Sequence, residues 1–189
     1  MMDSTIRYRA NIIAKAYAPF LSEQHRVLDV GCGNGIVGEI IQKHTGCTMA
    51  GTDRFAYTKT ALPFTQMTSD TELPFEDASF DYAMFNDVLH HLPYEEQLPI
   101  VKEALRVSKN VLIFELHPTL LARAIDWGAN KIHYLLMPIP FSFRTLEGWR
   151  TFFTENGIPS RTFQVQRPAY YPISNFVLLL GQGVGEGAA

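Results

Sequence analysis

A run of glycines and a following aspartate occupy positions where a cofactor with a nucleoside could bind. The run, Gly31-Cys32-Gly33-Asn34-Gly35, follows a short apolar segment and precedes a stretch with helical spacing of apolar residues. Glycine has no Cβ, so a ligand can approach the backbone there, and the start of a helix offers free N–H groups and the positive end of its dipole. Asp53 ends the next predicted strand, where its carboxylate can accept hydrogen bonds from both hydroxyls of a ribose. Together these features predict a site for a nucleoside-bearing cofactor.

The charges near the glycines distinguish between two kinds of cofactor. Residues 33–38 formally match the G-x-G-x-x-G fingerprint of dinucleotide binding, with an acid about 20 residues further on. However, the predicted strand ends at Gly31, before the first fingerprint glycine, and Asp29 lies beside the place where a pyrophosphate would bind. A carboxylate repels phosphate and attracts an ammonium group, such as the one in the methionine part of S-adenosylmethionine (SAM). SAM therefore fits the charges better than NAD, and an NAD-dependent oxidoreductase is the alternative.

Strands and helices alternate along most of the chain. This alternation predicts parallel strands joined by right-handed crossovers, in a doubly wound α/β fold with a seven-stranded sheet. The last two strands are expected to form an antiparallel pair. Helices are expected from the N-cap Ser4 to Pro19, over 36–46, 98–107 and 118–136, and from the N-cap Thr145 to Gly157. The predicted strands are residues 27–30, 47–52, 64–68, 80–85, 111–115, 161–166 and 175–180.

Composition and charge limit the classes of partner. The 189 residues have a net charge of −3 and contain no run of Lys or Arg, so nucleic acid is not expected as a partner. The longest apolar run, residues 176–180, is too short to span a bilayer, and residues 1–9 do not resemble a signal peptide, so we expect a cytoplasmic protein. The two cysteines lack metal-ligand spacing, and Glu115 with His117 are too few ligands, so no metal site is expected.

The domain organisation follows from the same patterns. We expect a single domain over residues 1–181, because no break in composition marks a second core. Within it, residues 1–24 are expected to form an N-terminal helical cap, and residues 117–145 an insertion that covers the substrate. Residues 182–189 are rich in glycine and are expected to be a flexible tail. The oligomeric state stays open.

Three segments resemble motifs of class I SAM-dependent methyltransferases. Residues 27–35, Val-Leu-Asp-Val-Gly-Cys-Gly-Asn-Gly, resemble the first motif of that class. Residues 73–81 resemble the stretch that enters its fourth strand, and residues 86–92 resemble the exit from that strand. The chain is most similar to small-molecule methyltransferases of the ubiquinone and menaquinone biosynthesis type, over about residues 25–180. The resemblance implies a Rossmann-like sheet, mostly parallel, with an antiparallel C-terminal strand.

The resemblance also implies roles for particular residues in holding SAM. Gly31, Cys32 and Gly33 are expected along the methionine part, with Asp29 near its amino group. Asn86 is expected near the same end, and Asp53 at the ribose hydroxyls. The adenine is expected beside Asp70 and Thr71. The family usually has one more residue between the acid at the adenine and the Leu-Pro-Phe motif, so Ser69 is an alternative to Asp70. The full set of expected cofactor-binding residues is Asp29, Gly31, Cys32, Gly33, Asp53, Arg54, Asp70, Thr71 and Asn86.

The expected activity is transfer of a methyl group from SAM to a small, largely apolar acceptor. The insertion has enough apolar and aromatic side chains to enclose a ring or a short chain. His91 and Tyr8 are the candidates for a base, and the equal alternative for His90 and His91 is that one of them caps the next helix. A non-catalytic module that binds SAM is a further alternative to the enzyme. The insertion residues expected over the acceptor are Trp127, Ile132, Tyr134, Leu135, Met137, Phe141 and Phe143.

Overall fold

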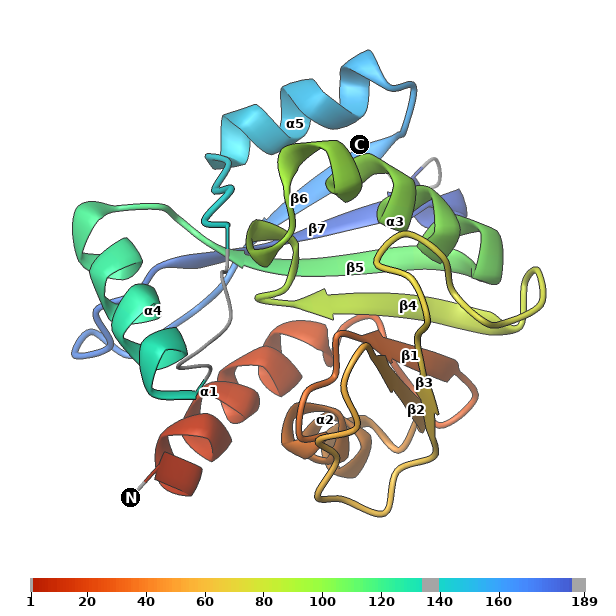
Figure 1. Ribbon diagram of the computed structural model, residues 1–189, viewed down its shortest axis with the longest axis horizontal. Helices are drawn as coiled ribbons and strands as arrows, with labels where there is room; N and C mark the ends of the chain where they lie inside the picture. The colour runs from red at the N-terminus through yellow and green to blue at the C-terminus, as the bar shows by residue number, and fades with distance from the viewer. Residues whose placement is uncertain (1, 134–139, 185–189) are drawn as a thin grey trace.

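A seven-stranded sheet runs through the middle of the molecule in a computed structural model that describes residues 2–133 and 140–184 (Figure 1). The order of its strands is β3-β2-β1-β4-β5-β7-β6. The five strands from β3 to β5 in this order are parallel to one another. β7 pairs antiparallel with both β5 and β6. The predicted fold class, with its antiparallel C-terminal strand, is confirmed. The strands are β1 Arg26–Val30, β2 Thr48–Asp53, β3 Phe64–Gln66, β4 Phe80–Asn86, β5 Ser108–Leu116, β6 Ser160–Gln164 and β7 Asn175–Gly181.

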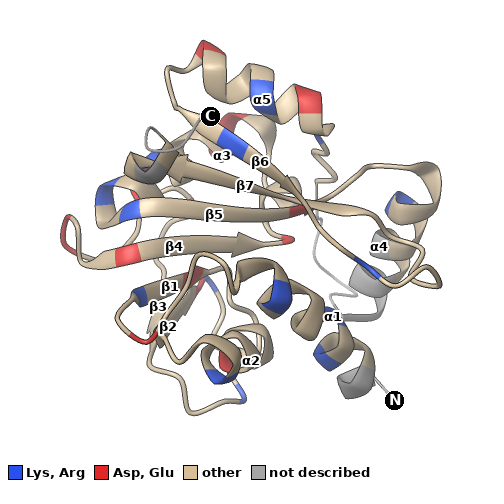
Figure 2. Ribbon diagram, turned by 180° about the vertical axis from the view of Figure 1, so that it is seen from behind, with Lys and Arg blue, Asp and Glu red and all other residues tan. Residues whose placement is uncertain are grey.

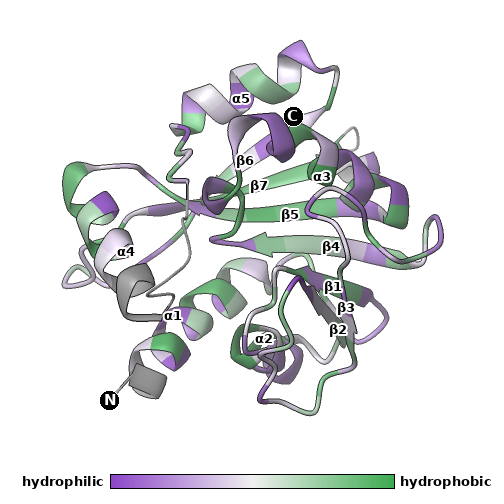
Figure 3. Ribbon diagram, in the orientation of Figure 1, coloured by the Kyte–Doolittle hydropathy of each residue, from purple (hydrophilic) through white to green (hydrophobic). Residues whose placement is uncertain are grey.

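Helices cover both faces of the sheet (Figure 1). Successive side chains of a strand point to opposite faces, so Leu28 packs with α3 and α5 while Val27 packs with α1 and α2. Figure 3 shows that β5 and β7 are hydrophobic along most of their length, as expected for strands buried on both sides. Among the described residues, no helix is long and apolar enough to cross a membrane. The helices are α1 Met2–Tyr17, α2 Ile36–Thr45, α3 Tyr94–Val107, α4 Leu120–His133 and α5 Leu146–Glu155, with short 3-10 helices at Leu89–His91 and Gln182–Val184.

The ends of the helices follow the predicted capping residues in two cases and not in a third. Gly46 ends α2 in the left-handed conformation, and its N–H donates to the carbonyl of Gln42. The Thr145 hydroxyl accepts from the N–H of Gly148 at 3.0 Å and so caps α5. Ser4, by contrast, was expected to be an N-cap, and this expectation is wrong, because α1 already begins at Met2.

Two peripheral segments differ in detail from the sequence-based expectation. The helix expected over 118–136 begins at Leu120, and residues 134–139 lie outside the described residues. In the segment expected to be a flexible tail, Gln182–Val184 form a turn of 3-10 helix, and Val184 packs against the core on the α1 side of the sheet. Residues 185–189 also lie outside the described part of the chain.

The packing of α5 generates a test of the fold. Phe153 is fully buried, and its ring stacks on Trp149 at a centroid distance of 5.5 Å. We expect Phe153→Ala to lower the free energy of unfolding by about 3–5 kcal/mol, because it removes a large apolar side chain and leaves a cavity. Urea denaturation checks this value, with the exposed Arg150→Ala as the control. A loss below about 1 kcal/mol would show that α5 does not pack as described.

Candidate functional site

The glycine loop between β1 and α2 adopts a backbone that only glycine accepts readily. Gly31 and Gly33 have φ values of 73° and 54°. The N–H of Gly31 donates to the carbonyl of Thr52 at 2.8 Å. A Cβ at Gly31 would lie 2.8 Å from the methyl groups of Val88, whereas a Cβ at Gly33 would meet no atom within 4 Å. The backbone at Gly33 therefore faces open space that a ligand can occupy.

That open space is part of a cavity of about 350 Å³ at the carboxyl edge of the sheet. Its volume is within the usual range for small-molecule and cofactor sites. The predicted site residues that line it are Gly31, Gly33, Asp53, Arg54, Asp70, Asn86 and His91. Lining residues that the sequence analysis did not assign to the site are Val30, Phe55, Tyr57, Met67, Phe85, Asp87, Val88, Leu92 and Ile100. Asp29, Cys32, Thr71 and Tyr8, which were also predicted, do not line this cavity.

Asp53 links the glycine loop to the segment that follows β2. One carboxylate oxygen, Oδ2, accepts from the N–H of Gly33 at 2.8 Å, and Oδ1 accepts from the N–H of Phe55 at 3.1 Å. Each oxygen keeps a second lone pair, which can accept a hydrogen bond from a ligand. Phe55 and Tyr57 stack with ring centroids 5.4 Å apart and are each 41% exposed. An acceptor for hydroxyl groups and a pair of aromatic rings thus lie together at this end of the cavity.

Asp70 lies at the same end and forms an ion pair with Arg54. Of the alternatives at this position, Asp70 lines the cavity. The hydroxyl of Ser69 turns instead to accept from the backbone N–H of Thr71 at 3.2 Å, and it lies 3.3 Å from the Thr71 hydroxyl. The local turn explains why Ser69 and Thr71 face each other while Asp70 projects outward.

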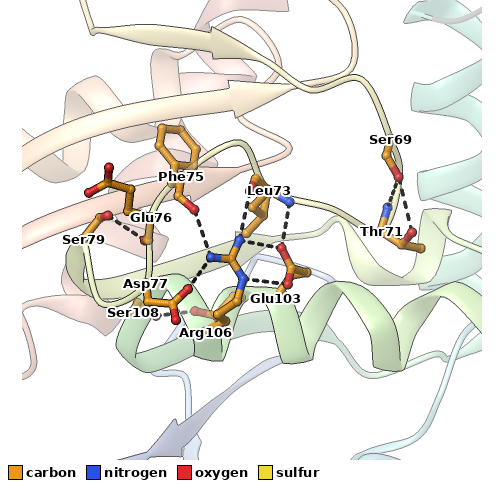
Figure 4. A network of polar contacts seen from close by, with 11 residues as sticks. Ser69, Thr71, Leu73, Phe75, Glu76, Asp77, Ser79, Glu103, Arg106 and Ser108 are labelled. Carbon is orange, nitrogen blue, oxygen red and sulfur yellow. Dashed lines mark hydrogen bonds and ion pairs between the residues drawn. The ribbon is translucent and has the colours of Figure 1, made fainter.

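Arg106 of α3 anchors the loop that follows Asp70 (Figure 4). Its guanidinium donates to the carbonyl oxygens of Leu73 and Phe75 at 3.0 and 2.9 Å. It also donates to the carboxylates of Glu103 and Asp77 at 2.7 to 2.8 Å. One planar side chain thereby uses its fan of N–H donors to tie several loop positions to α3. This network holds the Leu-Pro-Phe-Glu-Asp motif, residues 73–77, against α3.

Asp29 lies behind the cavity wall, where it is 1% exposed. Its Oδ1 accepts from Nδ2 of Asn86 at 3.0 Å, and this bond joins β1 to β4. Burial raises the pKa of Asp29 to about 7, partly opposed by the hydrogen bond from Asn86. Among the described residues, Oδ2 of Asp29 and Oδ1 of Asn86 have no hydrogen-bond partner although both are buried. Of these two residues, Asn86 lines the cavity at the end where an amino group was predicted, and Asp29 supports it from behind.

Cys32 occupies the predicted loop position, but its side chain turns away from the cavity. Its sulfur packs against β2 at Gly51, where a Cβ would lie 2.8 Å from Sγ. Burial raises the pKa of the Cys32 thiol above its usual range, so the group stays a neutral thiol. The side chain of Cys32 thus fills the space between two strands, and only its backbone belongs to the glycine loop.

The two candidate bases lie in different places. His91 ends the short 3-10 helix after β4 and lines the cavity. Tyr8 lies on α1, where its hydroxyl donates to the Tyr170 hydroxyl at 2.9 Å. That hydrogen bond, with a smaller effect of burial, raises the pKa of Tyr8 to about 12. His90 does not cap α3, whose N-cap is Pro93. It is buried instead and pairs with the Glu115 carboxylate at 2.6 Å.

The predicted absence of a metal site stays a prediction. Glu115 contacts His90, and His117 packs its ring on Phe176 at 4.9 Å. Within the part of the chain that the structure describes, no group of three or more His, Cys, Asp or Glu side chains is arranged to hold a metal ion.

An ion pair at the edge of the cavity and the aromatic pair near Asp53 were not predicted from the sequence. Arg9 of α1 binds Asp87 through two N–H groups, although 78 positions separate the two residues. No spacing rule connects residues so far apart, so no signal in a single sequence could have found the pair. Phe55 and Tyr57, in contrast, follow the ribose acid at alternate positions, which was a usable signal.

Comparison with known sequences finds similarity over part of the chain. Residues 28–114 match a protein family described as a methyltransferase domain. A protein of Haemophilus influenzae described as uncharacterized is 26% identical over 153 residues, which are 72% of this chain and 59% of that protein. The chain therefore spans less than two thirds of the length of this curated relative.

Solved structures share the fold over nearly the whole chain. A SAM-dependent methyltransferase from Archaeoglobus fulgidus has a TM-score of 0.66 at 14% identity, covering 95% of this chain and 94% of that one. Magnesium protoporphyrin IX methyltransferase from Synechocystis, with S-adenosylhomocysteine (SAH) bound, has a TM-score of 0.61 at 16% identity, covering 93% and 83%. These structures show that the chain shares their fold, and the domain match covers 87 of its 189 residues.

The position of Asp53 generates a test of the site. We expect Asp53→Ala to weaken binding of SAH at least about 10- to 100-fold, because even a single charge-assisted hydrogen bond to a ribose hydroxyl is worth roughly 1.5–3 kcal/mol. Isothermal titration calorimetry measures the affinity, with Glu155→Ala on the exposed end of α5 as the matched control. Unchanged affinity for SAH would remove Asp53 from the site.

The raised pKa of Asp29 can be tested through the pH dependence of stability. A carboxyl whose pKa is raised to about 7 in the folded protein stabilises the fold fully below pH 4, near its unfolded value, and that contribution is lost as the pH rises through 7. Asp29→Asn keeps an oxygen for Asn86 and removes the titration. Between pH 5 and pH 8, the stability of this variant should therefore rise relative to the unmodified protein by about 2–3 kcal/mol. Urea denaturation at the two pH values measures the free energy of unfolding of both proteins. An equal difference between the variant and the unmodified protein at pH 5 and pH 8 would contradict the raised pKa.

Proposed function

We propose that the chain transfers a methyl group from SAM to a small, largely apolar acceptor. The observation that carries the proposal is the mixed lining of the cavity. Asp53, Asp70 and the Gly31 and Gly33 backbone supply polar groups, while Val88, Leu92, Phe85 and Ile100, which belong to one hydrophobic cluster, supply apolar surface, and His91 also lines the cavity. Polar groups for the cofactor and apolar surface for the acceptor are what such a transfer needs.

The residues present fit the chemistry of SAM. Gly33 leaves room against the backbone, and Asp53 has free lone pairs for two hydroxyls. The unpartnered oxygens of Asp29 and Asn86 can accept from an amino group, either directly or through water. When bound, SAM supplies an activated methyl group on a positively charged sulfur. The aspartates of the lining suit that positive charge, whereas they would repel the phosphates of NAD.

The contribution of the protein is mainly to position the two reactants. Holding a nucleophile in line with the methyl group can supply about 7–11 kcal/mol of the reduction in the barrier. The glycine loop, Asp53 and the loop anchored by Arg106 hold one side of the site through the contacts described above. Val88 and Leu92 also line the cavity, and their apolar side chains offer water no group for a hydrogen bond. The apolar lining therefore favours an acceptor that approaches without its own hydration shell.

His91 is the residue we assign as base, where the nucleophile must lose a proton before it attacks. Imidazole is the side chain most often used for this task, and a base adds about 10²–10⁴-fold to a rate. Tyr8 suits the role less, because a pKa raised to about 12 leaves almost no phenolate near neutral pH. His91 also borders aromatic surface, with its ring 6.4 Å from that of Phe141.

The described residues of the predicted insertion, 117–133 and 140–145, do not line the cavity, and the preference for a small apolar acceptor rests on the cavity lining instead. Phe141 and Phe143 stack with centroids 5.9 Å apart, and they pack on a small cluster formed by Leu116, Ala122 and Ile173. Trp127 is 54% exposed. The predicted contacts from Tyr134, Leu135 and Met137 lie outside the described residues, as does the side chain of Ile132.

Charge gives no support to a nucleic-acid acceptor. Lys and Arg are spread over several elements rather than gathered on one face (Figure 2). By its name, the Synechocystis methyltransferase also acts on a small molecule. The more specific resemblance to the ubiquinone and menaquinone type stays a prediction, as do the cytoplasmic location and the oligomeric state.

Two measurements test the proposed function. SAM and SAH at 100 times their dissociation constants should stabilise the protein by about 2.7 kcal/mol in a thermal shift assay, and NAD should not. Methyl-labelled SAM, incubated with the protein and a metabolite extract, should then place label in the small-molecule fraction. Label found only in RNA or protein fractions would refute the proposed acceptor class, and a flat thermal response to SAM and SAH would refute the cofactor.

A further inference from the structure

Arg9 connects helix α1 to the end of β4 with an unusually complete set of contacts. Its Nε donates to Oδ2 of Asp87 at 2.6 Å, and its Nη2 donates to Oδ1 at 2.5 Å. Nη1 donates to the Tyr171 hydroxyl at 2.5 Å, and the guanidinium lies 5.4 Å from the centre of the Phe114 ring. The Arg9 and Asp87 side chains are only 22% and 18% exposed. One cation thus joins α1, β4, β5 and the loop between β6 and β7.

Asp87 is the middle residue of a segment on which the cavity depends. Asn86, Asp87 and Val88 all line the cavity. Asn86 binds Asp29, and Val88 lies so close to Gly31 that a Cβ there would clash. Asp87 itself has a φ of 57°, in the left-handed region that few residues other than glycine, asparagine and aspartate adopt. The two-point contact with Arg9 helps to hold Asp87 in this conformation.

The same contact controls the charge of the cavity wall. Asp53, Asp70 and Asp87 are the aspartates that line it. Arg54 pairs with Asp70, and Arg9 pairs with Asp87. Loss of Arg9 therefore leaves one further uncompensated negative charge facing the ligand. Such a charge attracts a ligand with a positive sulfur more than one with a neutral sulfur.

We propose that Arg9 is a positioning residue for methyl transfer, which fixes residues 86–88 and neutralises Asp87 so that the cavity does not hold SAM too tightly relative to SAH. The inference rests on the proposed function. The positive charge on sulfur disappears as the methyl group leaves, so an extra negative charge stabilises the bound substrate more than the transition state. Arg9 thereby favours both turnover and a balanced affinity for substrate and product.

The test compares the affinities of four variants of the full chain for SAM and for SAH by calorimetry at low salt. Arg9→Gln should shift the ratio of the two affinities toward SAM by about three- to tenfold, because Asp87 becomes uncompensated. Arg9→Lys keeps the charge and should keep the ratio near that of the unmodified protein. The double variant Arg9→Gln/Asp87→Asn should restore the ratio, since asparagine also tolerates the left-handed conformation. Arg7→Gln, at an exposed position of the same helix, is the control and should change nothing.

The outcomes separate this proposal from a structural role and from the proposed function. A fall in both affinities by the same factor in Arg9→Gln would overturn the proposal, because it would show that Arg9 only braces the fold. An unchanged ratio with unchanged affinities would overturn it as well. If Arg9→Gln does not fold, Asp87→Asn decides: it leaves the positive charge of Arg9 uncompensated, so the ratio should shift toward SAH, and an unchanged ratio would overturn the proposal. A protein that binds neither SAM nor SAH in its unmodified form would instead contradict the proposed function.

Discussion

β1 pairs in parallel with β2 on one side and with β4 on the other, and this placement brings three chain segments together at one edge of the sheet. The register sets Val30 opposite both Thr52 and Phe85, so the glycine loop emerges beside Asp53 and Asn86. Two hydrogen bonds then fix the arrangement, from Gly33 to Asp53 at 2.8 Å and from Asn86 to Asp29 at 3.0 Å. Ligands of open α/β sheets bind outside the carboxyl ends of strands for this geometric reason.

The carboxyl edge also brings several aspartates together, and they are held in three different ways. Asp53 accepts from backbone N–H groups, Asp70 and Asp87 pair with arginines, and Asp29 is buried with a raised pKa. Arginine partners and amide donors allow carboxylates to remain ionised close together, whereas burial favours the neutral acid. The result is a wall with an ordered pattern of negative charge. Such a wall suits a ligand that carries cationic groups and hydroxyls but no phosphate.

Local patterns in the sequence predicted the parts of the structure that depend on local chemistry. The strand–glycine–helix segment at 27–45, the left-handed Gly46 and the Thr145 cap all follow from neighbouring residues. The prediction of Ser4 as an N-cap was wrong because the helix extends to Met2. The direction of the Cys32 side chain depends on Gly51 of β2, and the pairing of Arg9 with Asp87 depends on how α1 crosses the sheet. Contacts of this kind arise from tertiary packing, which the spacing of residues in one sequence does not encode.

We propose that SAM binds along the carboxyl edge with its adenosine between Asp53 and Asp70 and its methionine part against Gly31, Gly33 and Asn86. A crystal structure of the protein with SAH tests this placement most directly. We expect both ribose hydroxyls within hydrogen-bond distance of the Asp53 carboxylate, and the sulfur directed toward Val88, Leu92 and His91. SAH bound at another place, or with its ribose away from Asp53, would contradict this placement.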